Sequence, residues 1–145
     1  MKSRYYPEQR PWTLAAAETL LNLSGGDSLM ETLGAQQLKN AVALQHMLLN
    51  HGVAYLADEV GMGKTYVALA VVSMFRHINP GFRVLYIAPS GNVRQKWVER
   101  EYTEFMERNI RVTDLRVRSF SRQPANKPLE CDTLDKWLES CTAPI

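Results

Sequence analysis

Residues 53–65 read Val53-Ala54-Tyr55-Leu56-Ala57-Asp58-Glu59-Val60-Gly61-Met62-Gly63-Lys64-Thr65, and this stretch decides the fold class that the sequence predicts. Its first residues, 53–57, are a short apolar run that is typical of a buried strand. The residues that follow it, 65–77, are rich in Val, Ala and Leu and are typical of a buried helix. A glycine loop between a strand and a helix is the context of a phosphate-binding loop.

The residue types in the loop suit phosphate chemistry. Gly61 and Gly63 permit positive φ and lack the Cβ atoms that would block close approach of a phosphate. Successive backbone N–H groups can then point at phosphate oxygens, assisted by the N-terminus of the helix. Lys64 supplies a cation for the β and γ phosphates, and the Thr65 hydroxyl can bind Mg²⁺. The alternative is a chance glycine turn before a helix, which the neighbouring strand, helix and Lys-Thr pair disfavour.

The rest of the chain alternates apolar runs with helical patterns. Residues 83–88 and 111–118 predict two further strands. Helices are expected at 13–23, 28–33, 35–50, 65–77, 92–108 and 132–140, after an irregular arm over 1–12. Strands alternating with helices predict an α/β fold with a parallel sheet in three layers.

One departure from the general loop motif points to a family. The motif has Gly or Ala five positions before Gly63, and this chain has Asp58 there. The run Leu56 to Thr65 closely resembles motif I of superfamily-two helicases of the Swi/Snf-like group. Residues 84–90, Val-Leu-Tyr-Ile-Ala-Pro-Ser, resemble motif Ia, with Trp97 where the family often has a tryptophan.

A third likeness lies upstream, where Gln37 resembles the glutamine that reads adenine in this family, although the usual residues before it are missing. A polar helix residue is the alternative for Gln37. The resemblance implies a P-loop RecA-like parallel sheet, here incomplete, and ATP with Mg²⁺ as cofactors. The implied nucleotide site comprises Gln37, Asp58, Glu59, Gly61, Met62, Gly63, Lys64 and Thr65, with Thr65 on the metal.

Nucleic-acid contacts are expected after the second strand. In the family this region touches the DNA backbone, which nominates Ser90, Asn92 and Arg94 for weak contacts that are independent of base sequence. The alternative for Ser90 and Asn92 is that they cap a helix. Trp97 is expected to be a core residue rather than a platform for base stacking.

Hydrolysis in this family needs an apolar strand ending in Asp-Glu, and no such run follows Thr65. We therefore expect no catalytic residue in these 145 residues, and an N-terminal piece of a DNA-dependent ATPase that lacks the remainder of its helicase core. Whether the chain is itself an enzyme stays open. The alternatives are another P-loop nucleotide-binding protein, such as a nucleotide kinase or GTPase, and a non-functional remnant of a helicase gene.

Three segments are expected: an N-terminal helical extension over 1–34, a partial ATP-binding domain over 35–120, and a loop with a short helix over 121–145. The composition is ordinary for a globular protein, with a net charge of +2 that excludes no partner class. No apolar run reaches 18 residues, so no membrane partner is expected. Two cysteines without a metal spacing are consistent with a reducing compartment, the cytoplasm or, in a eukaryote, the nucleus.

Overall fold

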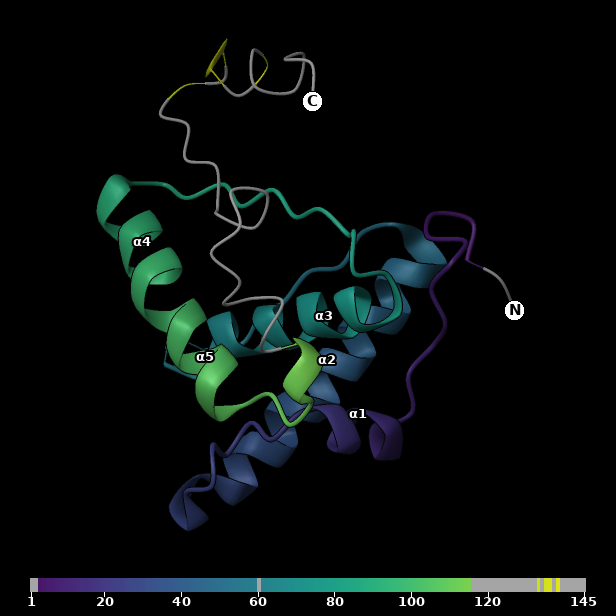
Figure 1. The fold of residues 1–145 in the computed structure, drawn as a ribbon, viewed down its shortest axis with the longest axis vertical. Coiled ribbons are helices and arrows are strands. Elements are labelled where there is room, and N and C mark those ends of the chain that lie inside the picture. Colours follow the sequence, from purple (N-terminus) through teal and green to yellow (C-terminus); the bar gives the residue numbers. More distant parts are fainter. Residues whose placement is uncertain (1–2, 60, 116–132, 134, 137, 139–145) are drawn as a thin grey trace.

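A computed structural model describes residues 3–59, 61–115, 133, 135–136 and 138. The described part is a set of helices joined by extended segments (Figure 1). In chain order the elements are α1 (Leu14–Leu20), the 3₁₀ turn η1 (Ser28–Met30), α2 (Glu31–His51), α3 (Lys64–Ile78), α4 (Gly91–Gln95), the π-helical η2 (Lys96–Glu101) and α5 (Tyr102–Arg108). Within the described ranges, no helix is both long enough and apolar enough to span a bilayer.

The prediction of an α/β fold with a RecA-like parallel sheet is wrong for the residues that the structure describes. They contain no β-strand, and their one isolated bridge pairs Leu21 with Ile110 in antiparallel fashion. Residues 53–59 and 82–88 are extended but belong to no ladder. Of the third expected strand, residues 113–115 are helical and 116–118 lie outside the described part. Apolar composition favours extended backbone, but a strand exists only where a neighbour accepts its hydrogen bonds, and none does so here.

The main helices are confirmed near their expected positions. Thr13 caps α1, its hydroxyl accepting a hydrogen bond from Ala16 N at 3.1 Å. α2 is longer than expected because it begins at Glu31 and continues through Gly34, and it ends at Gly52 in the left-handed conformation. The expected helix at 92–108 is present as the continuous run from α4 to α5. The helix expected at 132–140 lies largely outside the described residues.

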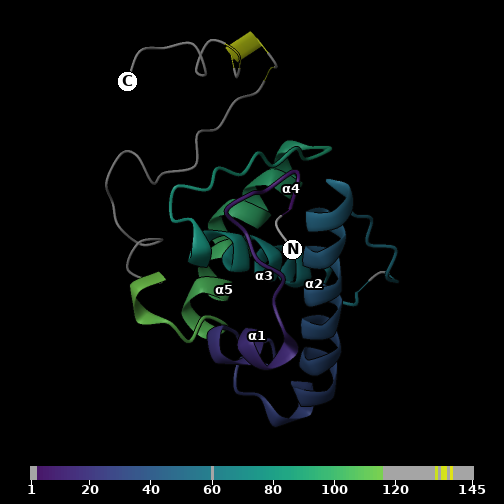
Figure 2. The same cartoon turned by 90° about the vertical axis from the view of Figure 1, so that its right-hand side faces the viewer.

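The core forms around α3, which lies between α2 and the α4–α5 segment (Figures 1 and 2). Seven of the fifteen residues of α3 are buried, as its nearly unbroken apolar sequence predicts. Phe75 on α3 packs against Tyr6 of the N-terminal arm and Phe82, with ring centroids 5.0 and 4.9 Å away. Tyr66 at the other end of α3 meets Phe105 of α5 edge-on at 5.6 Å.

The N-terminal arm has no regular structure, yet buried amides tie it to the helices. The fully buried Gln45 of α2 donates from Nε2 to Arg10 O at 2.7 Å and accepts from Trp12 N at 3.2 Å. The buried Gln9 donates to Phe75 O at the C-terminal end of α3, at 3.0 Å. The Gln45 bonds supply the arm's backbone with partners that a helix or sheet would otherwise provide, and the Gln9 bond attaches the arm's side chain to the backbone of α3.

Candidate phosphate-binding site

The candidate site is the loop between Gly52 and α3, which Figure 2 shows as a thin trace beside α2. Lys64 is the first residue of α3, and Gly63 occupies the N-cap position. Gly61 and Gly63 have φ of 90° and 75°, in the left-handed region that glycine adopts at no steric cost. No described side chain caps the N-terminus of α3. Its first turn therefore keeps the positive end of the helix dipole available to an anion.

Lys64 turns back onto its own loop. Its Nζ donates to the carbonyl oxygens of Asp58 at 2.8 Å and Glu59 at 2.9 Å. Asp58 and Glu59 thus contact Lys64 through their backbone and not through their carboxylates. Thr65 is half-buried in the same helical turn. The structure brings together the loop residues that the sequence nominated.

Gln37 also joins the site, but through the loop backbone. Its side chain is 7% exposed, and its Nε2 donates to Met62 O at 3.0 Å. A Cβ atom on Gly63 would lie 2.3 Å from the same nitrogen, so the Gln37 amide would have to move aside. The positive φ of Gly63 is the stronger reason for glycine at this position. The adenine-reading role expected for Gln37 stays a prediction.

The sequence analysis missed Asn40, one helical turn after Gln37 on α2. Its Nδ2 donates to the Asp58 carboxylate Oδ2 at 3.1 Å, and its Oδ1 accepts from Gln36 at 3.0 Å. Asp58, the residue at which the loop departs from the general motif, therefore has a hydrogen-bond partner on α2. Two amides spaced i, i+3 on the helix before the loop were the signal that could have found it.

An open groove of ≈ 690 Å³ borders the loop at Met62. The first half of α2 and the turn before it supply the other walls. The lining residues are Leu29, Thr32, Leu33, Ala35, Gln36, Lys39 and Met62. All of these residues except Leu33 are exposed, so the groove is an open surface depression and not an enclosed pocket.

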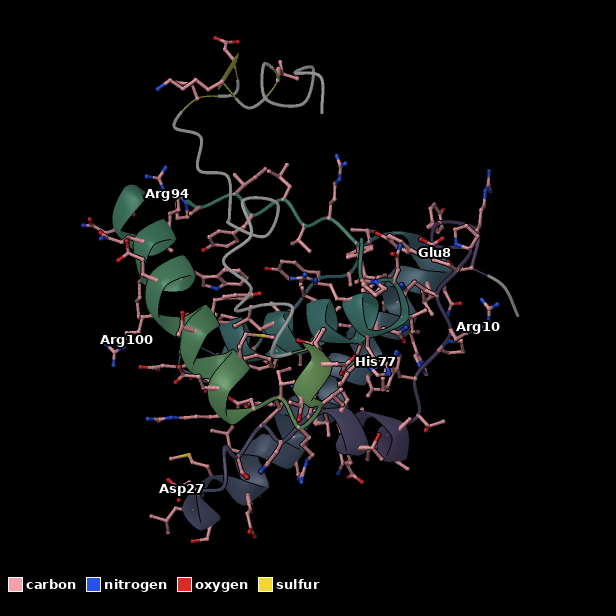
Figure 3. All side chains as sticks on the ribbon, viewed as in Figure 1. Glu8, Arg10, Asp27, His77, Arg94 and Arg100 are labelled. Carbon is pink, nitrogen blue, oxygen red and sulfur yellow. The ribbon has the colours of Figure 1, made fainter. Side chains whose placement is uncertain are left out.

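The expected nucleic-acid residues lie at the start of α4 and not on the loop. Ser90 is the N-cap of α4, and its hydroxyl accepts a hydrogen bond from Val93 N at 3.5 Å. Ser90 thus has the helix-capping role that was the alternative to a contact with nucleic acid. Asn92 is exposed, and Arg94 lies on α4, where Figure 3 labels it. Trp97 stacks on Tyr86 at 4.1 Å with an angle of 6° and packs against the core, as expected.

The family of the chain follows from its sequence. Residues 29–130, more than half of the chain, match the family described as type III restriction enzyme, res subunit. The chain belongs to this family. As a res-subunit relative it is helicase-like and belongs to superfamily two, which confirms the broader part of the expected resemblance. The matched range of this res-subunit relative contains Gln37, the loop and α4. Comparisons with curated proteins and with solved structures found no match.

Proposed function

We propose that the chain binds Mg·ATP or Mg·ADP at Gly61, Gly63, Lys64 and Thr65. The observation that carries the proposal is the uncapped N-terminus of α3, preceded by two left-handed glycines and headed by Lys64. Phosphate oxygens are stronger acceptors for an ammonium group than peptide carbonyls. On binding, Lys64 would exchange its bonds to Asp58 O and Glu59 O for bonds to phosphate.

The residues present fit a nucleotide carrying Mg²⁺. The Thr65 hydroxyl is a hard oxygen ligand placed directly after the lysine, and Mg²⁺ takes few protein ligands and keeps water and phosphate for the rest. Among the described residues no group of three or more His, Cys, Asp or Glu could hold a metal ion. We therefore infer that the ion arrives with the phosphates. The nucleoside end has room in the groove beside Met62.

Within superfamily two we propose the Swi/Snf-like group, a DNA-dependent ATPase, on the strength of the run from Leu56 to Thr65. We propose that these 145 residues bind nucleotide without sustained hydrolysis, because no Asp-Glu pair follows Thr65 in the sequence. Hydrolysis needs such a group to orient the attacking water. It also needs an arginine finger, which alone raises the rate by about 10³–10⁵ and which helicases supply from the second lobe. Family membership argues against the nucleotide-kinase and GTPase alternatives.

For nucleic acid we propose weak contacts to the DNA backbone through Ser90, Asn92 and Arg94. The supporting observations are the exposure of Ser90 and Asn92 and the basic side chains that follow on α4 and η2. Anisotropy of labelled duplex DNA at rising salt tests this, because binding through phosphates weakens steeply with salt. Binding that does not change with salt, or that Arg94→Ala leaves intact, would count against it.

The nucleotide proposal is tested by titrating labelled ATP, with Mg²⁺, into the wild type and Lys64→Ala. Losing charge-assisted bonds of about 1.5–3 kcal/mol should weaken binding roughly 10- to 100-fold. Lys96→Ala is the matched control, since Lys96 is an exposed lysine of η2 that pairs with Glu101 and is not part of the loop. Equal binding by wild type and Lys64→Ala would overturn the site, and no binding by the wild type would favour a non-functional remnant. Hydrolysis is tested by measuring phosphate release with saturating duplex DNA. Repeated turnover would contradict the proposal that these residues bind nucleotide without sustained hydrolysis.

A further inference from the structure

We propose that Gln37 and Asn40 are positioning residues that hold the phosphate loop from α2, one at each end, and that Gln37 acts on the loop and not on the adenine base. The inference rests on the proposed nucleotide binding and deepens it. It assigns a role to Asn40 and gives Asp58 a function that the general loop motif does not contain.

The first point of attachment is the end of the loop nearest α3. Gln37 is buried, and its Nε2 is hydrogen-bonded to Met62 O at 3.0 Å. The amide also lies against Gly63, where a Cβ would come within 2.3 Å of it. The same side chain thus holds the Met62 peptide and packs closely against Gly63, whose positive φ favours glycine. A buried amide with a backbone acceptor has a defined rotamer, so it can hold the loop in one conformation.

The second point of attachment is the beginning of the loop. Asn40 Nδ2 is bonded to Asp58 Oδ2 at 3.1 Å, and Gln36 donates to Asn40 Oδ1 at 3.0 Å, which orients the Asn40 amide. Asp58 O in turn accepts from Lys64 Nζ. The Asn40–Asp58 bond therefore places the carbonyl that Lys64 contacts.

Both attachments are made to the loop itself, at Met62 O and at the Asp58 carboxylate, although Met62 and Gln36 also line the groove where a nucleoside has room. Freeing either end lets the loop sample conformations that a phosphate cannot use, and affinity falls by the fraction of competent loops. The predicted loss of affinity therefore depends on the phosphates of the ligand and not on its base. Binding of the polyphosphate should weaken by the same factor whatever base is attached to it.

The first experiment measures affinities for Mg·ATP, Mg·GTP and Mg·tripolyphosphate in the wild type and Gln37→Met. Losing one neutral hydrogen bond predicts a loss of roughly 2- to 12-fold, equal for the three ligands. A loss confined to ATP would overturn the inference in favour of adenine reading, and unchanged binding of all three would overturn it outright. Wild type that binds none of the three would instead refute nucleotide binding itself, which separates the two failures.

The second experiment exchanges donor and acceptor. Asn40→Asp sets two carboxylates against each other and should weaken tripolyphosphate binding roughly 3- to 10-fold, and Asp58→Asn alone should also weaken it. The double variant restores an amide–carboxylate pair in reverse and should recover most of the affinity. Asn50→Asp, an exposed position on the same helix, is the matched control. Equal melting temperatures with lost affinity exclude a merely structural effect, and a double variant no better than the singles would overturn the pairing.

Discussion

Lys64 Nζ lies 2.8 Å from the carbonyl oxygen of Asp58, six residues earlier in the chain, and the same nitrogen contacts Glu59 O at 2.9 Å. The side chain proposed to bind phosphate thus closes its own loop. Ligand binding and loop closure draw on the same three N–H donors, so they compete.

This competition predicts the behaviour of the loop in limited proteolysis. Without ligand, Lys64→Ala should be cut faster than the wild type by a Glu-specific protease after the exposed Glu59, because two hydrogen bonds across the loop are lost. Mg·ATP should protect the wild type and leave the variant unprotected. Equal cleavage rates for both proteins without ligand would show that the Lys64 bonds do not hold the loop closed.

Gln45 is expected to be a main anchor of the N-terminal arm. Gln45→Leu keeps a buried side chain of similar size but leaves Arg10 O and Trp12 N without their partners. An unsatisfied buried polar group costs about 1–3 kcal/mol, so the free energy of unfolding should fall by that order. Urea denaturation followed by circular dichroism measures it. Asn50→Leu, an exposed position on the same helix, should change little, and a loss as large as for Gln45→Leu would argue against the anchor.

Gly34 marks the closest approach of α2 to the segment that follows α1. A Cβ at this position would lie 2.6 Å from Ser24 N and 2.9 Å from Leu23 C, both backbone atoms. Gly34→Ala should therefore destabilise the fold by about 1–3 kcal/mol through overpacking, despite the better helix propensity of alanine. Gly91→Ala is the control, because its Cβ would meet nothing within 4 Å. A Gly34→Ala variant that melts above the wild type would contradict this packing.

Stability should fall at alkaline pH. Burial, followed by the negative charges of Glu104 and Glu101, raises the pKa of Tyr66 above its ordinary value of 10.0. The folded state then holds the phenolic proton more tightly than the unfolded state. The contribution is fully present below about pH 10 and is lost as the pH rises through the folded pKa. Tyr66→Phe should flatten the fall in melting temperature above pH 10, whereas Tyr55→Phe, at a position 82% exposed, should leave it unchanged.

The helices and the loop could be predicted because their causes are local. A helix satisfies its backbone bonds four residues away, so Thr13, the apolar run of α3 and the glycines at 61 and 63 carried the information in their own neighbourhood. The ends of the helices were harder to predict, since α2 runs through Gly34, where the sequence predicted a break between two helices. That glycine serves close packing against residues 23–24 and not termination.

The sequence by itself determined where the main helices lie, that the extended segments at 53–57 and 83–88 are not helical, and that a glycine loop with Lys64 and Thr65 heads α3. It wrongly predicted a strand over 111–118, where residues 113–115 are helical. Only the tertiary structure decided what those extended segments and amides do. Residues 53–59 and 82–88 have strand-like composition, but hydrogen bonds between strands need a partner at a particular place in space, and in the described structure neither segment has one. For the same reason the sequence nominated Gln37 only for the adenine base and did not assign Asn40 to the loop. Their bonds to Met62 and Asp58 exist only because the loop folds back onto α2.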